Sequence, residues 1–158
     1  MSTDLNQKPQ ATKAICELTI DADAATVWRA LVEETHAWWL KDFYTRPNAV
    51  FRIEPRVGGR MFEDQGDGNG LVWGNVIGVD PHRSLDIQGY LTQDFGGPAL
   101  SYLAIRLEEA DAKTRVSVTD TIFGFPSQGT AGSMEEGWLM LFEKGLKAHV
   151  ERTAVTPN

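Results

Sequence analysis

Apolar and polar residues alternate along much of the chain with the period of two that is typical of β-strands. In the first such segment, residues 13–20, the apolar side chains of Ala14, Cys16, Leu18 and Ile20 share one face. Six further segments with this character occupy residues 49–54, 60–63, 71–79, 84–91, 100–109 and 114–123. The turns between them are short, so they predict an antiparallel meander, because parallel pairs need long crossover connections.

Two short segments after the first strand follow a helical period instead. Asp23 is a candidate N-cap for the first of these helices. Its apolar stripe consists of Val27, Trp28, Leu31 and Val32. Residues 33–40 predict a second short helix after a bend in the chain.

The longest helical pattern runs from Ser133 to Arg152, and Ser133 with Glu136 forms a predicted capping box at its start. Its apolar residues cover roughly 200°, which is much wider than the stripe of a helix on a flat sheet. They are Met134, Trp138, Leu141, Phe142, Gly145, Leu146 and His149. An arc of this width indicates a helix held inside a curved surface.

The order of these elements is one strand, two short helices, six strands and one long helix. A sheet of about seven strands must curve if it is to cover a single helix on one face. We therefore predict an α+β fold in which a curved antiparallel sheet wraps around the C-terminal helix. Residues 13–155 are interpreted as one domain, and the polar, unpatterned residues 1–12 as a flexible tail.

Composition narrows the function classes. The chain has 158 residues and a formal net charge of −7, which argues against a nucleic-acid partner and against docking on anionic lipid surfaces. Cys16 is the only cysteine, so no disulfide can form within the chain and a zinc site of the Cys/His kind lacks ligands. There is no apolar run long enough for a membrane span and no signal-peptide core, so we expect a cytoplasmic protein. No cofactor is predicted.

Four stretches of the chain, in this order and spacing, resemble one known family. They are Ile20–Leu31, the Gly-Gly-Arg segment Val57–Glu63, the strand and Pro turn Gly74–Pro81, and the Gly-Trp segment Glu136–Phe142. The chain resembles the START-like helix-grip (SRPBCC) superfamily, and within it the AHSA1-like proteins related to the C-terminal domain of the activator of Hsp90 ATPase. The resemblance covers residues 14–152, and it implies a curved sheet that grips the C-terminal helix with a cavity between them.

The resemblance implies function only weakly, because a fold does not fix a function. The superfamily contains lipid carriers, hormone receptors, polyketide cyclases and co-chaperones. The separate N-terminal domain of the eukaryotic Hsp90 activator has no counterpart in this sequence, so an Hsp90-type chaperone is not the expected partner. The outer strands of the predicted sheet offer surfaces for a homodimer.

A group of aromatic residues could either line an apolar ligand cavity or fill the core. These are Trp38, Trp39, Phe43, Phe62, Trp73, Tyr90, Tyr102, Phe123, Trp138 and Phe142. The tyrosines matter most if they point inward, because a buried hydroxyl needs a hydrogen-bond partner, which could be a ligand.

Three polar or small residues are candidates for a different reason. Asp120 alternates with Val118 and Ile122, so it is either a polar anchor or acid/base group in an apolar wall, or a partner of Arg60 or Arg106. His149 lies on the apolar helix arc, where it either faces a ligand or is hydrogen-bonded within the core. Gly145 costs helix stability, and it indicates either space for a ligand or a closely packed neighbour.

These observations favour a binding module that holds an apolar or amphipathic small molecule between the C-terminal helix and the sheet. The mouth is expected near residues 38–43, 95–98 and 124–132. One alternative is an enzyme of the cyclase, dehydratase or hydrolase kind that acts on an aromatic or polyketide-like substrate. Another is an interaction protein that resembles a co-chaperone or stress-response partner.

Overall fold

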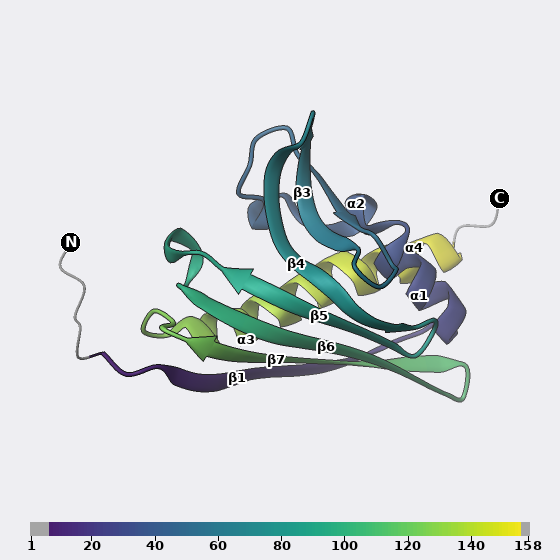
Figure 1. Ribbon diagram of the computed structural model, residues 1–158. Coiled ribbons are helices and arrows are strands. Elements are labelled where there is room, and N and C mark those ends of the chain that lie inside the picture. Colours follow the sequence, from purple (N-terminus) through teal and green to yellow (C-terminus); the bar gives the residue numbers. More distant parts are fainter. Residues whose placement is uncertain (1–6, 156–158) are drawn as a thin grey trace.

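A seven-stranded antiparallel sheet forms the body of the protein, and the computed structural model describes residues 7–155 of it. The strands are β1 (Gln10–Ile20), β2 (Val50–Ile53), β3 (Arg60–Gly66), β4 (Asn69–Asp80), β5 (Ser84–Leu91), β6 (Ala99–Ala110) and β7 (Lys113–Gly124). They are arranged in the order β1-β7-β6-β5-β4-β3-β2, so β2 to β7 form a meander and β1 closes against β7. The sheet curves around the C-terminal helix (Figure 1), which confirms the predicted helix-grip fold.

The first strand begins earlier than its sequence pattern predicts. Residues 10–12 are already paired with β7, and Gln10 lies opposite Gly124. The side chains of this segment are exposed or half-buried at the edge of the sheet. The segment therefore lacks the alternation of apolar and polar residues that predicts a strand. Residues 7–9 precede the strand, and the rest of the predicted tail lies outside the described residues.

The predicted helices after β1 are present. Helix α1 spans Ala24–Val32, and its first turn is capped by Asp23, whose Oδ1 accepts a hydrogen bond from the Thr26 amide at 2.8 Å. Helix α2 (Thr35–Trp38) and the 3-10 turn η1 (Lys41–Phe43) follow, and a second turn, η2 (Gln93–Phe95), precedes β6. Helix α1 lies beside α4 (Ala148–Val155), at the C-terminal end of the long helix (Figure 1).

The long C-terminal helix is continuous but contains a π-helical segment. It consists of α3 (Thr130–Met140), the π-helix η3 (Leu141–Lys147) and α4 (Ala148–Val155). The predicted start at Ser133 is wrong, because the Ser133 amide already donates to the Gly129 carbonyl oxygen at 3.0 Å. The Thr130 hydroxyl instead fixes the first turn by donating to the Gly96 carbonyl oxygen at 3.2 Å.

Side chains of the C-terminal helix attach it to β1, an edge strand whose backbone groups would otherwise lack partners. Glu135 accepts from the Ile15 amide at 3.0 Å, and Glu151 accepts from the Asp21 amide at 2.9 Å. Between them, the Lys147 ammonium donates to the Thr19 carbonyl oxygen at 2.7 Å. These bonds fix the position of the helix along the sheet.

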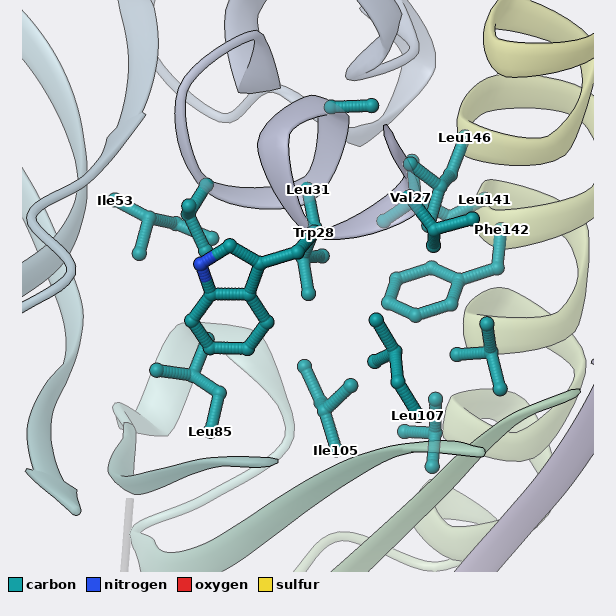
Figure 2. Close-up of a cluster of buried hydrophobic side chains, with 14 of the residues drawn as sticks. Val27, Trp28, Leu31, Ile53, Leu85, Ile105, Leu107, Leu141, Phe142 and Leu146 are labelled. Atoms are coloured by element: carbon teal, nitrogen blue, oxygen red, sulfur yellow. The ribbon is translucent and has the colours of Figure 1, made fainter. Parts of the chain in front are cut away.

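The two halves of this helix have different surroundings. Figure 2 shows Phe142 and Leu146 pointing toward Val27 and Leu31 of α1, and these four side chains are fully buried. In α3, by contrast, Thr130 is the buried residue, and the remaining side chains are half-buried or exposed. The second half therefore belongs to the core, whereas the first half lies over a less filled part of the sheet.

Gly145 lies in the core half, and its environment settles the question that the sequence raised. A Cβ atom at this position would stand 2.5 Å from the Trp38 carbonyl oxygen and 3.1 Å from its Cε3 atom. The glycine is therefore required by a close approach of the α2 segment to the helix, and not by a ligand in the sheet cavity.

We expect Gly145→Ala to destabilise the protein by about 1–3 kcal/mol, even though alanine favours a helix, because the added methyl group cannot displace the Trp38 backbone. Thermal unfolding of the variant measures this loss. The control is Gly132→Ala in α3, where no atom lies within 4 Å of the added Cβ, and this variant should be as stable as the parent or more stable. Equal stabilities for the two variants would contradict the tight contact.

Candidate functional site

An apolar cavity lies between α3 and the concave face of the sheet, and its volume is about 260 Å³. The helix contributes Ser133, Met134, Gly137, Trp138 and Leu141. The sheet contributes Met61, Trp73, Gly89, Tyr90, Leu91, Ser101, Leu103, Asp120 and Phe51, and the segment after α1 adds Trp39 and Phe43.

Stacked aromatic rings form one wall of this cavity. The Trp39 ring lies parallel to Phe51, with centroids 3.5 Å apart and an interplanar angle of 8°. It also meets Trp138 edge-on at 6.5 Å. Rings locked in this way cannot rotate freely, so the wall is rigid and presents flat apolar surface. The indole N–H of Trp39 is buried and has no hydrogen-bond partner among the described residues.

Asp120 is the ionisable side chain among the residues that line the cavity. It lies on β7, between Ala14 of β1 and Leu103 of β6 in the register of the sheet, and it is 1% exposed. Its Oδ2 accepts a hydrogen bond from the Trp138 indole N–H at 3.1 Å. Its Oδ1 is buried and has no partner among the described residues, so one acceptor remains unused in an apolar site.

Burial raises the pKa of Asp120 above its usual range, and the hydrogen bond from Trp138 acts in the opposite direction. The Ser101 hydroxyl also lowers this pKa through its proximity, but it is not in hydrogen-bonding geometry with the buried Oδ1. The two arginines considered as partners from the sequence lie elsewhere. Arg60 binds Glu54 at 2.8 Å, and Arg106 binds Asp86 at 2.7 Å. No cation among residues 7–155 forms an ion pair with Asp120, and its unpaired Oδ1 is a strong acceptor in an apolar site.

Ser101 owes its position to a glycine on the neighbouring strand. Gly89 lies opposite Ser101 in the β5–β6 register, and a Cβ at Gly89 would collide with the Ser101 hydroxyl oxygen. The glycine thus leaves room for a hydroxyl on the cavity floor. Both residues line the cavity, and Ser101 is buried.

Buried Glu63 holds together the side of the cavity that is formed by β3, β4 and the preceding loop. Its two carboxylate oxygens accept four hydrogen bonds, from the Thr45 amide, the Thr45 hydroxyl, the Arg46 amide and the Trp73 indole N–H, at 2.7–2.9 Å. Glu63 forms no ion pair among the described residues. Glu63 instead orients Trp73 and anchors the loop after η1.

The three segments that we expected at the mouth of the cavity are held by contacts with their surroundings, and only the first of them, with Trp39 and Phe43, lines the cavity itself. The Phe43 ring would lie 3.5 Å from a Cβ at Gly137, so η1 and α3 approach closely there. Phe95 of η2 meets the Trp73 ring edge-on at 5.5 Å. The Ser127 amide donates to the Gly96 carbonyl oxygen at 2.9 Å, which joins the two Gly-rich loops that we expected at the mouth.

The structure brings half of the predicted site residues to this cavity. They are Trp39, Phe43, Trp73, Tyr90, Asp120 and Trp138. The Tyr90 hydroxyl already donates to Asn75 Oδ1 at 2.7 Å, so it does not need a ligand as its partner.

Three predicted residues point away from the cavity. Tyr102 and Phe123 are 39% and 50% exposed, because the strand alternation places them on the opposite face from Ser101 and Ile122. Phe62 lies beneath the Arg60 guanidinium, whose Cζ is 4.0 Å from the ring centroid. A register irregularity between Met61 and Phe62 separates it from the cavity wall.

The other three predicted residues belong to the core half of the helix and its contacts. Trp38 donates its indole N–H to the Ala30 carbonyl oxygen at 2.7 Å, and Phe142 packs edge-on against it at 5.8 Å. His149 Nε2 lies 2.8 Å from Glu34 Oε1, so this histidine is a hydrogen-bonded residue near the end of the helix. These side chains do not line the cavity.

Sequence reasoning missed several lining residues, and two of them carried a usable signal. Ser101 shares its strand face with Leu103, Ile105 and Leu107, so it is a polar residue on an apolar face in the same way as Asp120. Gly137 lies one helical turn from Leu141 and belongs to the same helix face. Met134 belongs to the predicted apolar arc of the helix, whereas the contributions of Phe51 and Met61 depend on packing between distant segments.

Other chemistry is limited in the described part of the chain. Residues 7–155 contain no group of three or more His, Cys, Asp or Glu side chains arranged to hold a metal ion. Burial, with smaller effects from Glu135 and Glu143, raises the pKa of the Cys16 thiol to about 11, so at neutral pH it stays a protonated core residue. No helix among the described residues has the length and apolarity needed to cross a bilayer.

Solved structures share this fold over nearly the whole chain. An uncharacterized protein from Rhizobium leguminosarum is 17% identical with a TM-score of 0.71, and the match covers 92% of this chain and 97% of that one. Protein MLL2253 from Mesorhizobium loti is 24% identical with a TM-score of 0.69, over 90% and 98% of the two chains. DynU16, a protein in the dynemicin biosynthetic locus, is 19% identical with a TM-score of 0.63, over 88% of this chain and 47% of that one.

Of two comparisons with known sequences, one identifies the family of this chain. A search of curated proteins gave no match. The family described as "Activator of Hsp90 ATPase homolog 1-like protein" matches residues 21–151, from the start of α1 to α4. Because that match covers most of the chain, this protein is a member of the Activator of Hsp90 ATPase homolog 1-like family.

Proposed function

We propose that this protein binds a neutral, largely apolar small molecule with a single hydrogen-bond donor in the cavity between α3 and the sheet. The observation that carries the proposal is the unused, buried Oδ1 of Asp120 in the wall of an apolar cavity. A buried acceptor without a partner is costly to fold, so its presence is best explained by a ligand that completes it.

The volume of the cavity limits the size of the ligand. An engineered cavity of about 150 Å³ binds benzene, whereas pockets for drug-sized ligands usually begin at about 300 Å³. The cavity of about 260 Å³ lies between these values, so it suits a molecule with one or two rings. The parallel Trp39 and Phe51 rings favour a flat ligand.

Two kinds of contact would hold such a ligand. Burial of its rings against Trp138, Leu141 and Leu103 would supply most of the affinity, at about 25 cal/mol per Å² of apolar surface. A hydroxyl or N–H group directed at Asp120 would set its orientation. The location of DynU16 in a biosynthetic locus supports a small organic molecule as the ligand of related folds, although its sequence is distant.

Gly137→Leu should abolish this binding without weakening the fold. Gly137 lines the cavity, and the leucine side chain would occupy ligand space while also favouring the helix. The affinity for 2-naphthol, a fluorescent probe, should fall about tenfold or more in Gly137→Leu. The leucine side chain would replace contacts with the naphthol rings that contribute more than about 1.4 kcal/mol.

The matched control is Gly132→Leu, which makes the same change in the same helix at an exposed position outside the cavity. It should bind 2-naphthol like the parent protein. Native mass spectrometry of the purified protein provides a second measurement, in which a co-purified molecule should be lost from Gly137→Leu alone. If both leucine variants bind the probe as the parent does, the cavity is not the binding site.

An enzyme is the second candidate, and one observation favours it. Asp120 combines a raised pKa with an apolar site and a nearby serine hydroxyl, which is the environment of a general acid or base. A proton-transfer enzyme on an aromatic substrate would lose turnover in Asp120→Asn while the substrate still binds. If the parent protein instead releases its ligand chemically unchanged after incubation, this result would favour the binding function.

A further inference from the structure

A second hollow lies on the other side of the Trp38–Trp39 segment, between that segment and the core half of the C-terminal helix. We call it the basic groove, and its volume is about 670 Å³. Residues 36–41, Tyr44, Arg46, Asn48 and Ala49 form one side, and Lys144, Gly145, His149 and Arg152 form the other. Trp39 lines both this groove and the apolar cavity, so the two sites share a wall.

The charge of the groove differs from that of the whole chain. Acidic residues outnumber lysine and arginine by 22 to 15 in the sequence. The groove nevertheless contains Lys41, Arg46, Lys144 and Arg152, together with two histidines, and none of its lining residues is aspartate or glutamate. A concave surface lined by one sign of charge concentrates its electrostatic potential and attracts ligands of the opposite sign.

The Glu34 carboxylate contacts a groove residue, but it is shared with a cation outside the groove. Glu34 lies beside His149, but it is also 3.5 Å from the Arg29 guanidinium. In the part of the chain that the structure describes, Lys41, Arg46 and Lys144 form no ion pair. Their charged groups are therefore available to an anion from solution.

The backbone that carries these cations is fixed by buried contacts. The Arg46 amide donates to Glu63 Oε1 at 2.9 Å, which anchors the loop on one side of the groove. Lys144 belongs to the π-helical segment and precedes Gly145, which packs directly on Trp38. A site whose two walls are held in place loses little entropy when a ligand binds.

We propose that the basic groove binds a small soluble molecule that carries a phosphate group. Arginine and lysine side chains are the usual donors to phosphate oxygens, and arginine can bind two of them at once. The flanking aromatic residues Trp39 and Tyr44 give the groove apolar surface for the uncharged part of the molecule. This inference is independent of the apolar cavity, because the cations that carry it do not line that cavity and the ligand chemistry is the opposite.

Pyrophosphate is a suitable probe for the groove, and calorimetric titration of the full chain measures its binding. The ionic strength is held constant with NaCl, because salt screens exposed charges. The parent protein should bind one pyrophosphate with a saturable isotherm. The double variant Arg46→Gln/Lys144→Gln should bind it at least about tenfold more weakly, because two charge-assisted contacts are lost.

The matched control is Arg56→Gln/Arg83→Gln, which lowers the net charge by the same amount at exposed turns outside the groove. Its pyrophosphate affinity should stay within about twofold of the parent, since distant surface charges contribute little. Thermal unfolding of both variants checks that they remain folded. An equal loss in the two variants, or the absence of saturable binding by the parent, would overturn the proposal.

A lipid headgroup presents the same phosphate chemistry, so the experiment includes vesicles of phosphatidylcholine with phosphatidylserine. The proposal expects no vesicle binding that depends on Arg46 and Lys144. The contrary result has three parts: the parent protein sediments with these vesicles, the Arg46→Gln/Lys144→Gln variant does not, and neither protein binds pyrophosphate. This result would assign the groove to a membrane surface and contradict a soluble ligand.

Discussion

Glu63→Ala should lower the free energy of unfolding by about 3–5 kcal/mol, the largest loss that we expect from a single change outside the apolar core. Glu63 is completely buried, and it accepts four hydrogen bonds from Thr45, Arg46 and Trp73. Its removal leaves these donors without an acceptor, and each buried donor in that state costs about 1–3 kcal/mol. Chemical denaturation monitored by tryptophan fluorescence measures the change.

The control for this prediction is Glu54→Ala. Glu54 pairs with the Arg60 guanidinium, and this interaction lowers the pKa of Glu54 to about 2. Unlike Glu63, this pair is accessible to solvent at the edge of the sheet. Exposed pairs of this kind contribute about 1 kcal/mol or less. A loss in Glu63→Ala no larger than that in Glu54→Ala would mean that Glu63 does not organise the loop and Trp73.

The sequence predicted the fold well because the fold depends on local periodicity. Alternation of apolar and polar residues predicted strand β5 at its observed bounds, and it predicted β6 and β7 to within one residue at each end. The first residue of β1 and the first residue of the C-terminal helix depend instead on tertiary contacts. Strand β1 extends to Gln10 because β7 offers a partner there, and the last helix begins at Thr130 because its hydroxyl meets Gly96 of a distant loop.

The alternation of residues along a strand predicted part of the candidate site, because it determines which side chains face the cavity. Alternation put Asp120 on the same strand face as Val118 and Ile122, which left an apolar wall and an arginine partner as alternatives, and the structure places it in the cavity wall. The same rule, applied to Tyr102 and Phe123, puts both outside, so aromatic character alone was a poor guide. The space beneath α3 could not be predicted, because it depends on how distant segments fill the volume between helix and sheet.

The C-terminal helix has one half that packs in the core and one half that borders the cavity. From Leu141 onward its inward side chains fill the core against α1 and α2, and Gly145 permits the close contact there. Before that point, Gly137 and Trp138 border a cavity, and α3 is largely exposed. A cavity at this half can remain open because the other half supplies the packing that holds the helix on the sheet.

Asp120→Asn should stabilise the protein at neutral pH, by about 1 kcal/mol or more, because it removes an unneutralised charge from an apolar site. Burial raises the pKa of Asp120 in the folded state. Between the unfolded and the folded pKa the folded state therefore binds more protons, so the free energy of unfolding falls as pH rises through that window. Asparagine does not titrate. The advantage of the variant should be present above this window and vanish below about pH 3, where the aspartate is protonated in both states.

The same substitution should reduce the selectivity of the cavity, and two matched probes measure this effect. The parent protein should prefer 2-naphthol to 2-methylnaphthalene, because the hydroxyl of the former can donate to Asp120 Oδ1 whereas a methyl group of similar size cannot. A hydrogen bond to a charged acceptor exceeds one to a neutral acceptor by about 1.4 kcal/mol, so the preference should fall about tenfold in Asp120→Asn. Affinity for 2-methylnaphthalene should not decrease, since its contacts are apolar. An unchanged preference, in a variant that is nevertheless more stable, would mean that the unused oxygen of Asp120 does not recognise the ligand and that its cost in stability has another origin.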